Sequence, residues 1–225
     1  MIRLFTGWDH REAVGWGVFT SSVIRRCREP VSIVPLHGTQ GDGSNAFTYA
    51  RFWIADLCQY EGWAIFADGC DMVCLADLAD LWALRDERFA VQVVKHAYAT
   101  KDKVKYRGTE MECPNIDYKG KNWSSLMLIN CGHPKALRLT PATQFDVGMH
   151  RFDWLDERED VGSLSREWNW ICDEFGENST AKILHWTRGI PAFTQYRITP
   201  MADVWFTEYM DSQRGLQKEA LCQPD

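Results

Sequence analysis

Residues 64–73, with the sequence AIFADGCDMV, decide the fold, because an apolar run ends there in two closely spaced carboxylates and then resumes. The apolar half predicts a short interior strand. Gly69 permits a sharp turn or the close approach of a ligand. Asp68 and Asp71 supply the hard oxygen ligands that suit a divalent cation. The stretch therefore predicts a buried strand that delivers acids to a ligand, and the alternative is a turn with two solvated carboxylates.

The segments on either side alternate between strand and helix patterns. Residues 2–5 predict a first strand, residues 11–27 a helix, and residues 31–36 another strand. Pro35 lacks a backbone donor, so it indicates either a sheet edge or the end of a strand. Further elements are expected as a helix capped by Ser44 or Asn45, a short helix capped by Asp77, and strands at 89–94, 125–130 and 181–186. This order predicts an α/β protein whose mixed, mostly parallel sheet is flanked by helices.

Length and charge limit the possible organisation and partners. The 225 residues, 45% of them hydrophobic, supply the core of one domain, so we expect a single domain over residues 1–225. The last dozen residues are polar and are expected to be frayed. The formal net charge is -6, with lysines and arginines scattered among acids, which argues against a nucleic-acid partner.

The hydrophobic stretches and cysteines indicate a compartment. The N-terminal apolar stretch is shorter than the core of a signal peptide, and no run approaches the roughly 18 apolar residues that span a bilayer. We therefore expect a cytoplasmic protein without a transmembrane segment, for which membrane contact is peripheral. In that compartment the eight cysteines are expected to be free thiols.

Three expected strands end in polar residues, namely 6–9, 68–71 and 185–189. In a mostly parallel sheet, ligands bind beyond the carboxyl ends of the strands, so we expect these three ends to converge on one crevice. Each has an alternative interpretation. Asp9 is also a good cap for the following helix, and His185 also fits a hydrogen-bonded core position.

The chemistry that such a crevice supports is sugar transfer from a nucleoside diphosphate. A divalent cation stabilises the charge that develops on a departing diphosphate, and Asp68, Asp71 and His185 are its candidate ligands. Oxygen-rich ligation favours Mg²⁺ or Mn²⁺, and one imidazole shifts the preference toward Mn²⁺. Arg51 offers a fork of donors to phosphates, or else forms a surface ion pair. The aromatic candidates for stacking on a sugar or base, chosen because they flank polar strand ends, are Trp8, Trp123 and Trp186.

Taken in order, these segments resemble family 8 glycosyltransferases and their short bacterial and phage relatives. The resemblance covers about residues 2–195 and rests on six collinear pieces: the strand ending near Asp9, SNAFTYARF at 44–52, the acidic strand with DLADLW at 77–82, SLMLIN at 125–130, Trp168-Asn169, and HWT at 185–187. It implies a GT-A fold (Rossmann-like), a nucleoside-diphosphate sugar donor with a UDP-sugar expected, a divalent metal and retention of anomeric configuration.

The resemblance also implies roles for individual residues. The metal motif falls on Asp68 and Asp71, and the late histidine ligand on His185. The nucleotide-contacting positions fall on Asp9, Tyr49 and Arg51. Further candidates for the nucleotide end, which lie beside these segments or beside the polar strand ends, are Thr6, Trp8, Asn45, Trp168 and Trp186. The candidates for bordering the transferred sugar or the acceptor, and so for a catalytic role, are Asn122, Ser124, Trp168 and Asn169, and the alternative is that these four are ordinary loop and packing residues. The acceptor is expected to be a glycan or a lipopolysaccharide-type molecule.

The sequence departs from the family pattern at three places. The acids are spaced Asp-Gly-Cys-Asp where the family usually has Asp-x-Asp, residues 122–125 replace Asn-Ala-Gly, and no Asp-Gln-Asp segment occurs between Gln144 and Asp160. These departures favour one rival, a catalytically silent nucleotide-sugar or carbohydrate-binding module. A second rival is a sugar nucleotidyltransferase, which would carry a basic, glycine-rich loop where residues 8–12 read WDHRE. Residues 99–121 predict a long loop, or a hairpin, that sets specificity.

Overall fold

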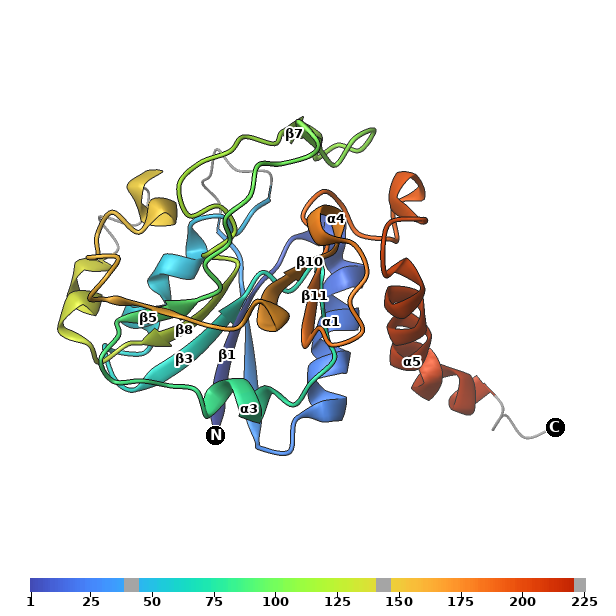
Figure 1. Cartoon of the computed structure of the whole chain (residues 1–225). Coiled ribbons are helices and arrows are strands. Elements are labelled where there is room, and N and C mark those ends of the chain that lie inside the picture. Colours follow the sequence, from blue (N-terminus) through green and yellow to red (C-terminus); the bar gives the residue numbers. More distant parts are fainter. Residues whose placement is uncertain (39–44, 141–146, 221–225) are drawn as a thin grey trace.

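A computed structural model of the chain describes residues 1–38, 45–140 and 147–220, and a six-stranded sheet lies at its centre (Figure 1). The order β2-β1-β3-β8-β5-β9 comprises β2 (Val31–Leu36), β1 (Ile2–Gly7), β3 (Trp63–Ala67), β8 (Leu126–Asn130), β5 (Val91–Val93) and β9 (Val161–Ser163). In this sheet β8 runs antiparallel to both of its neighbours, whereas the other pairs are parallel. The predicted mixed, mostly parallel α/β sheet is confirmed.

The central strand forms because its sequence is apolar on both faces. Every residue of β3 is buried, as expected for a strand that is covered by other elements on both sides. Pro35 lies in β2 at the edge of the sheet, where its missing N–H leaves no ladder bond unmade. The edge interpretation of Pro35 is therefore confirmed, with its physical reason.

The late strand corrects one expectation. We expected residues 181–186 to end in the parallel sheet, but β11 (Ile183–His185) belongs to a second sheet of order β10-β11-β4, with β10 (Trp170–Ile171) and β4 (Met72–Cys74). β11 runs antiparallel to β4 and pairs His185 with Met72. The ends near Asp68 and His185 therefore meet because the chain passes at the acidic turn from β3 in the central sheet to β4 in the second sheet, where β11 is its antiparallel neighbour.

Helices cover the sheets and tie the C-terminus to the body. α1 (Ala13–Arg26) follows the 3-10 turn η1 (His10–Glu12) and lies beside α5 (Ala202–Ala220) in Figure 1. Arg25 and Arg26 of α1 form ion pairs with buried Glu208 of α5. α5 continues to Ala220, and residues 221–225, the end of the segment expected to be frayed, lie outside the described residues.

The remaining helical elements are short. Asp77 caps α3 (Leu78–Trp82) by accepting from Ala79 N, as predicted. The single helix expected after residue 45 is instead η2 (Ala50–Trp53) followed by α2 (Ile54–Leu57), and Ser44 lies outside the described residues. The others are η3 (Pro134–Arg138), η4 (Val147–Arg151), η5 (Arg166–Asn169), α4 (Cys172–Phe175) and η6 (Thr194–Tyr196).

Residues 99–121 contain the hairpin that the sequence left open. β6 (Val104–Lys105) pairs antiparallel with β7 (Cys113–Pro114), and the hairpin lies above the sheets at the top of Figure 1. Tyr106 anchors it, since its N–H donates to Arg188 O at 2.6 Å and its hydroxyl lies 3.4 Å from Glu12 Oε2. The hairpin is thus held against the body close to the acidic turn.

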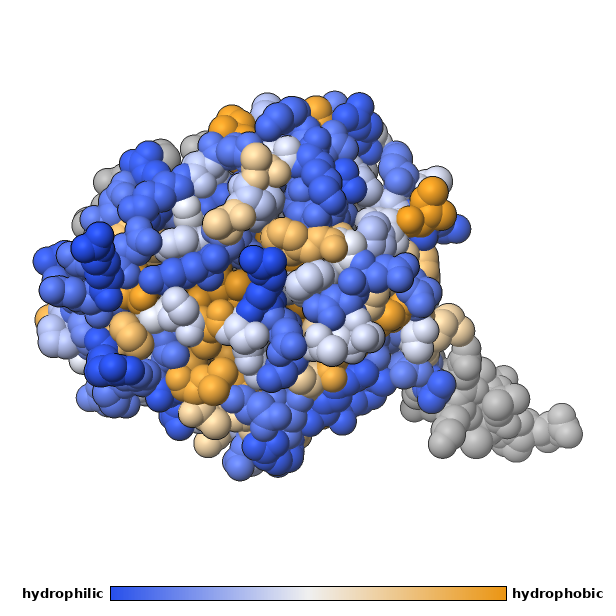
Figure 2. Space-filling view, in the orientation of Figure 1, coloured by the Kyte–Doolittle hydropathy of each residue, from blue (hydrophilic) through white to orange (hydrophobic). Residues whose placement is uncertain are grey.

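The surface is mainly hydrophilic. Figure 2 shows hydrophilic residues over most of one face, with hydrophobic residues grouped near its middle. None of the helices in the described ranges combines the length and apolarity needed to cross a bilayer. The seven cysteines of these ranges are free thiols.

Candidate functional site

The three predicted metal ligands lie together where the two sheets meet. One ligand atom from each of Asp68, Asp71 and His185 lies within 4.8 Å of the others, and all three side chains are buried. Gly69 makes this possible, because its φ of +76° reverses the chain between the two acids at little cost. The Asp-Gly-Cys-Asp spacing therefore still brings both carboxylates to one point.

The cluster fits a divalent cation. His185 Nε2 lies 3.2 Å from Asp71 Oδ2, while the other oxygen, Asp71 Oδ1, is buried without a hydrogen-bond partner among the described residues. A buried charged oxygen without a partner is costly, by about 1–3 kcal/mol or more, and a cation would satisfy it. Two carboxylates and one imidazole form a donor set that suits Mn²⁺ or Mg²⁺.

Burial and neighbouring charges shift the pKa values in the cluster. Burial raises the pKa of Asp68 to about 6, although the Arg51 guanidinium opposes this shift. For His185, burial disfavours the charged ring, but the adjacent Asp71 carboxylate outweighs that effect and raises the pKa. Burial thus disfavours the ionised form of Asp68, the Arg51 charge offsets this only in part, and a bound cation would relieve it.

Arg51 is buried beside Asp68 and does not form the surface ion pair that was its alternative interpretation. Its Nη1 lies 2.8 Å from Asp68 Oδ1 and donates to Ser124 O at 2.8 Å, and its Nε donates to Thr48 O at 2.9 Å. The guanidinium also lies 4.7 Å from the centre of the Phe66 ring. Arg51 therefore links η2, the acidic turn and the start of β8.

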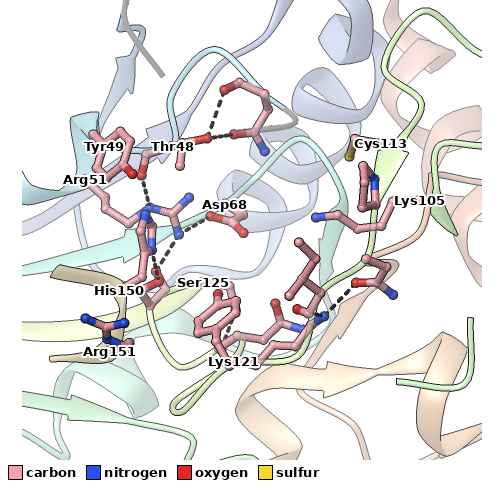
Figure 3. A pocket seen from close by; sticks show the side chains of 17 residues that line it. Thr48, Tyr49, Arg51, Asp68, Lys105, Cys113, Lys121, Ser125, His150 and Arg151 are labelled. Carbon is pink, nitrogen blue, oxygen red and sulfur yellow. Dashed lines mark hydrogen bonds and ion pairs between the residues drawn. The ribbon is translucent and has the colours of Figure 1, made fainter. Parts of the chain in front are cut away.

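A cavity of about 610 Å³ opens beside Asp68. In Figure 3, Lys105 reaches from the hairpin side toward Asp68, while Thr48, Tyr49 and Arg51 lie on the opposite side. The predicted site residues that line this cavity are Asn45, Tyr49, Arg51, Asp68, Asn122 and Ser124. The cavity therefore joins predicted nucleotide, metal and acceptor positions from distant parts of the sequence.

Cations dominate the charged lining of the cavity. Arg51, Lys105, Lys121 and Arg151 line it together with one carboxylate, that of Asp68. Lys121 is held by Asn115 Oδ1 and Ile116 O, each 2.7 Å from its Nζ, and burial lowers its pKa to about 8. The lining therefore favours an anionic ligand.

Lys105 differs from its neighbours in the cavity. Within the described ranges, no carboxylate lies within 4.0 Å of its ammonium group. Its Nζ lies over the ring of Tyr106, 5.8 Å from the ring centre. The sequence identified the loop and its lysines but did not single out Lys105, because it is the pairing register of the hairpin that places this side chain in the cavity wall.

The residues predicted to border the sugar form a hydrogen-bonded layer. Asn122 Nδ2 donates to Tyr98 Oη at 2.6 Å, and Ser124 Oγ lies 3.0 Å from His150 Nδ1. Asn169 is buried and does not line the cavity, since its amide Oδ1 lies 2.9 Å from His185 Nδ1. Asn169 thus lies behind the metal cluster.

The end of β1 supports the site indirectly. Asp9 caps η1 by accepting from Arg11 N, and it also accepts from Ala46 N at 2.9 Å. Burial disfavours its charged form, but hydrogen bonds from Arg11 and Ala46 lower its pKa to about 2. Thr6 is buried and accepts from Trp16 Nε1. The capping alternative for Asp9 is therefore realised in the structure.

The tryptophan candidates divide by burial. Trp168 and Trp186 are 1% and 0% exposed and lie in separate apolar clusters, and Trp123 is also buried, with its Nε1 donating to His96 O. Large aromatic surfaces stabilise most when they are removed from water, so these three rings pack in the core. Trp8 is half-buried and packs edge-on against His37.

Glu12 and His150 are two site neighbours that sequence reasoning missed. Glu12 is fully buried, and burial together with the charge of Asp71 raises its pKa well above its usual range. His150 lines the cavity from η4. No sequence pattern marked either residue, because Glu12 resembles an ordinary first-turn acid and His150 lies in a region without a clear period.

Solved glycosyltransferase structures share this fold. The WbbM bifunctional glycosyltransferase matches with a TM-score of 0.62 and 17% identity over 92% of this chain. GlyE of Streptococcus pneumoniae TIGR4 matches with a TM-score of 0.63 and 13% identity over 100% of this chain. An active-site mutant of LgtC matches with a TM-score of 0.59 and 11% identity over 93% of this chain. The chain spans 49%, 65% and 96% of these three chains, respectively. The predicted GT-A fold is confirmed, and membership of family 8 stays a prediction.

A relative at higher identity defines the family. No protein-family model matches the chain. Protein CDI of Arabidopsis thaliana is 35% identical over 240 residues, which cover 97% of this chain and 90% of that protein. Identity at this level over almost the full length of both proteins establishes kinship, and the chain belongs to the family of Protein CDI.

Proposed function

We propose that the chain is a metal-dependent glycosyltransferase that uses residues 1–225 as one domain. It moves a sugar from a nucleoside-diphosphate sugar, with a UDP-sugar expected, to a glycan or lipopolysaccharide-type acceptor, with retention of configuration. The observation that carries this proposal is the Asp68, Asp71 and His185 cluster at the edge of a cation-lined cavity.

The acidic cluster and the cavity wall would contact the diphosphate in different ways, the cluster through a cation and the wall through side chains. Asp68, Asp71 and His185 would hold Mn²⁺ or Mg²⁺, which when bound stabilises negative charge on the departing diphosphate. Arg51 orients Asp68 through their ion pair. Lys105, without a carboxylate partner in the described ranges, offers its ammonium group to a phosphate oxygen from the opposite wall.

Other residues position the donor and the acceptor. Tyr49 and Asn45 line the end of the cavity beside η2, where we place the nucleotide. Asp9 holds that segment through Ala46 N. Asn122 and Ser124 line the cavity near Asp68, where we place the transferred sugar and the acceptor.

The Arg51–Asp68 ion pair favours a second candidate, a catalytically silent module that binds nucleotide sugars. This pair partly neutralises one acid of the cluster without any cation. Such a module would bind a nucleotide in the cavity equally well with and without metal. A sugar nucleotidyltransferase has less support, because Arg11 in the loop after β1 is turned onto Asp9.

Calorimetry with UDP and with GDP, each with and without Mn²⁺, separates these candidates. The glycosyltransferase proposal expects Mn²⁺ to strengthen nucleotide binding and expects slow hydrolysis of the matching donor. Nucleotide binding that ignores Mn²⁺, without donor hydrolysis, would instead establish the silent module. Formation of a nucleotide sugar from a sugar phosphate and a nucleoside triphosphate would establish the nucleotidyltransferase.

A further inference from the structure

A chain of hydrogen bonds runs from the cavity wall to the back of the metal cluster. Asn169 Nδ2 donates to Asn122 O at 3.2 Å and to Ser125 Oγ at 2.9 Å. On its other side, Asn169 Oδ1 lies 2.9 Å from His185 Nδ1. Asn169 is 0% exposed, so water does not compete for these bonds.

One backbone carbonyl determines which group donates and which accepts in each of these hydrogen bonds. Asn122 O can only accept, so the amide group of Asn169 must turn its Nδ2 toward it. Ser125 Oγ donates its proton to the same carbonyl at 2.7 Å, which leaves the hydroxyl oxygen to accept from Asn169. If the Asn169 amide were flipped, its Oδ1 would face Asn122 O and Ser125 Oγ, and neither contact would be a hydrogen bond while the Ser125 proton is donated to Asn122 O. Its Oδ1 therefore faces His185.

The orientation of the Asn169 amide has a consequence for His185. An amide oxygen only accepts, so His185 Nδ1 must carry a proton. Nε2 lies 3.2 Å from Asp71 Oδ2, and a carboxylate oxygen also only accepts, so Nε2 donates to it while no cation is bound. A cation at the acids would displace the Nε2 proton and take the lone pair of Nε2, while Nδ1 keeps its proton. The ring thus presents its metal-binding nitrogen to the acids.

We propose that Asn169 is a positioning residue, which keeps His185 in the Nδ1–H tautomer with Nε2 directed at the cation site. This inference rests on the proposed function, because it assigns a use to the predicted metal cluster. Asn122 anchors the arrangement from a left-handed backbone conformation, with φ of +59°, which asparagine adopts more readily than most residues. The same residue lines the cavity, so the cavity wall and the metal ligand are held as one unit.

Three variants test the role of Asn169 with Mn²⁺ alone as the probe. Asn169→Leu keeps the volume but removes the acceptor, and we expect Mn²⁺ affinity to fall about 10–100-fold. Asn169→Asp keeps an oxygen facing Nδ1, and its second oxygen can accept from the Ser125 hydroxyl but faces the Asn122 carbonyl oxygen, so part of the affinity should return. Ser125→Ala leaves the Asn122 carbonyl in place and should change the affinity less than about threefold. Paramagnetic resonance of free Mn²⁺ measures all three.

Nitrogen-15 resonances of His185 test the tautomer independently of metal and activity. They are assigned with a His185→Gln variant and read in metal-free protein. We expect a proton on Nδ1 in the wild type and in Asn169→Asp, and loss of that proton, with Nε2–H left facing Asp71, in Asn169→Leu. A wild-type Nδ1 without a proton overturns the inference, as does wild-type Mn²⁺ affinity in folded Asn169→Leu.

The outcomes also separate this inference from the proposed function. If the wild type binds no Mn²⁺, the proposed metal site fails, and the tautomer measurement still decides whether Asn169 orients His185. If Asn169→Leu does not fold, Asn169→Asp and the wild-type resonances decide the question. Loss of Mn²⁺ binding in Asn169→Asp, with the fold intact, counts against the inference.

Discussion

The metal cluster and the cavity wall are built in different ways. Asp68, Asp71 and His185 lie on strand ends, buried and tied by hydrogen bonds to neighbouring elements. The opposite wall comes from the hairpin of residues 99–121, where Lys105 is half-buried and Ile116 is 70% exposed. The difference teaches that strand ends provide the geometry that a cation demands, while a loop provides the contacts that select a ligand. Changes near the cluster should therefore alter stability, and changes in the hairpin should alter affinity.

Removing Arg51 should give the largest loss of stability. Arg51→Met leaves the Asp68 carboxylate buried without its partner, which costs about 3–5 kcal/mol of unfolding free energy for a buried pair. Urea unfolding measures the loss. The matched control is Arg88→Met, which breaks an exposed ion pair with Asp86 and should change the unfolding free energy far less, because solvent screens exposed pairs. Equal losses in the two variants would show that the cluster side is no more tightly built than the surface.

Two glycines of α1 provide a sharper contrast. A Cβ at Gly15 would lie 1.9 Å from Cys70 O in the acidic turn, whereas a Cβ at Gly17 would meet nothing within 4 Å. Gly15→Ala should therefore destabilise the protein by about 1–3 kcal/mol through overpacking and should weaken Mn²⁺ binding. Gly17→Ala should stabilise it by about 0.5–1 kcal/mol, because alanine favours the helix. Thermal unfolding decides, and a Gly15→Ala protein as stable as the wild type would contradict the close approach of α1 to the turn.

Lys105 tests the cavity wall. Lys105→Met removes the cation that faces Asp68 across the cavity, so UDP affinity should fall about tenfold, or about 1.4 kcal/mol, while the unfolding free energy changes little. Calorimetry measures the affinity. Lys103→Met is the control, because Lys103 is paired with Asp117 and does not line the cavity. An equal effect of both variants would mean that the hairpin acts through its overall charge alone.

Asp9 should give the smallest effect, and its sign depends on pH. Its folded pKa of about 2 lies below the usual value of 3.8, so ionised Asp9 stabilises the fold above about pH 4. This contribution is lost as the pH falls toward 2. Linkage alone would give about 2.4 kcal/mol for this shift, and solvent screening of the partly exposed Arg11 partner reduces it. Asp9→Asn should therefore be less stable than the wild type by about 1 kcal/mol at pH 6 and nearly equal to it at pH 2. Urea unfolding across this range would contradict the assignment if the difference stayed constant.

The strands and the three residues of the acidic cluster were predictable because local chemistry marks them. Apolar runs that end in acids or histidine identified β3, β11 and the residues Asp68, Asp71 and His185. Pro35 indicated a sheet edge or a strand end for the same local reason. These features require no knowledge of which segments pair.

The remaining features depend on long-range pairing. The second sheet arises because β11 pairs with β4, and the apolar pattern of β11 is the same in either sheet. The burial of Trp168 and Trp186 depends likewise on which elements cover them. The position of the Lys105 side chain in the cavity wall depends on the register of the hairpin. Sequence patterns specify an element but do not specify its neighbours.

The most direct test of the account is donor turnover by Asp71→Asn beside the wild type. Hydrolysis of the donor chosen by calorimetry is measured with and without Mn²⁺, and circular dichroism confirms that both proteins are folded. We predict Mn²⁺-dependent hydrolysis by the wild type and none above background by Asp71→Asn. Metal-dependent turnover retained in folded Asp71→Asn would contradict the central claim that this acidic turn holds the catalytic cation.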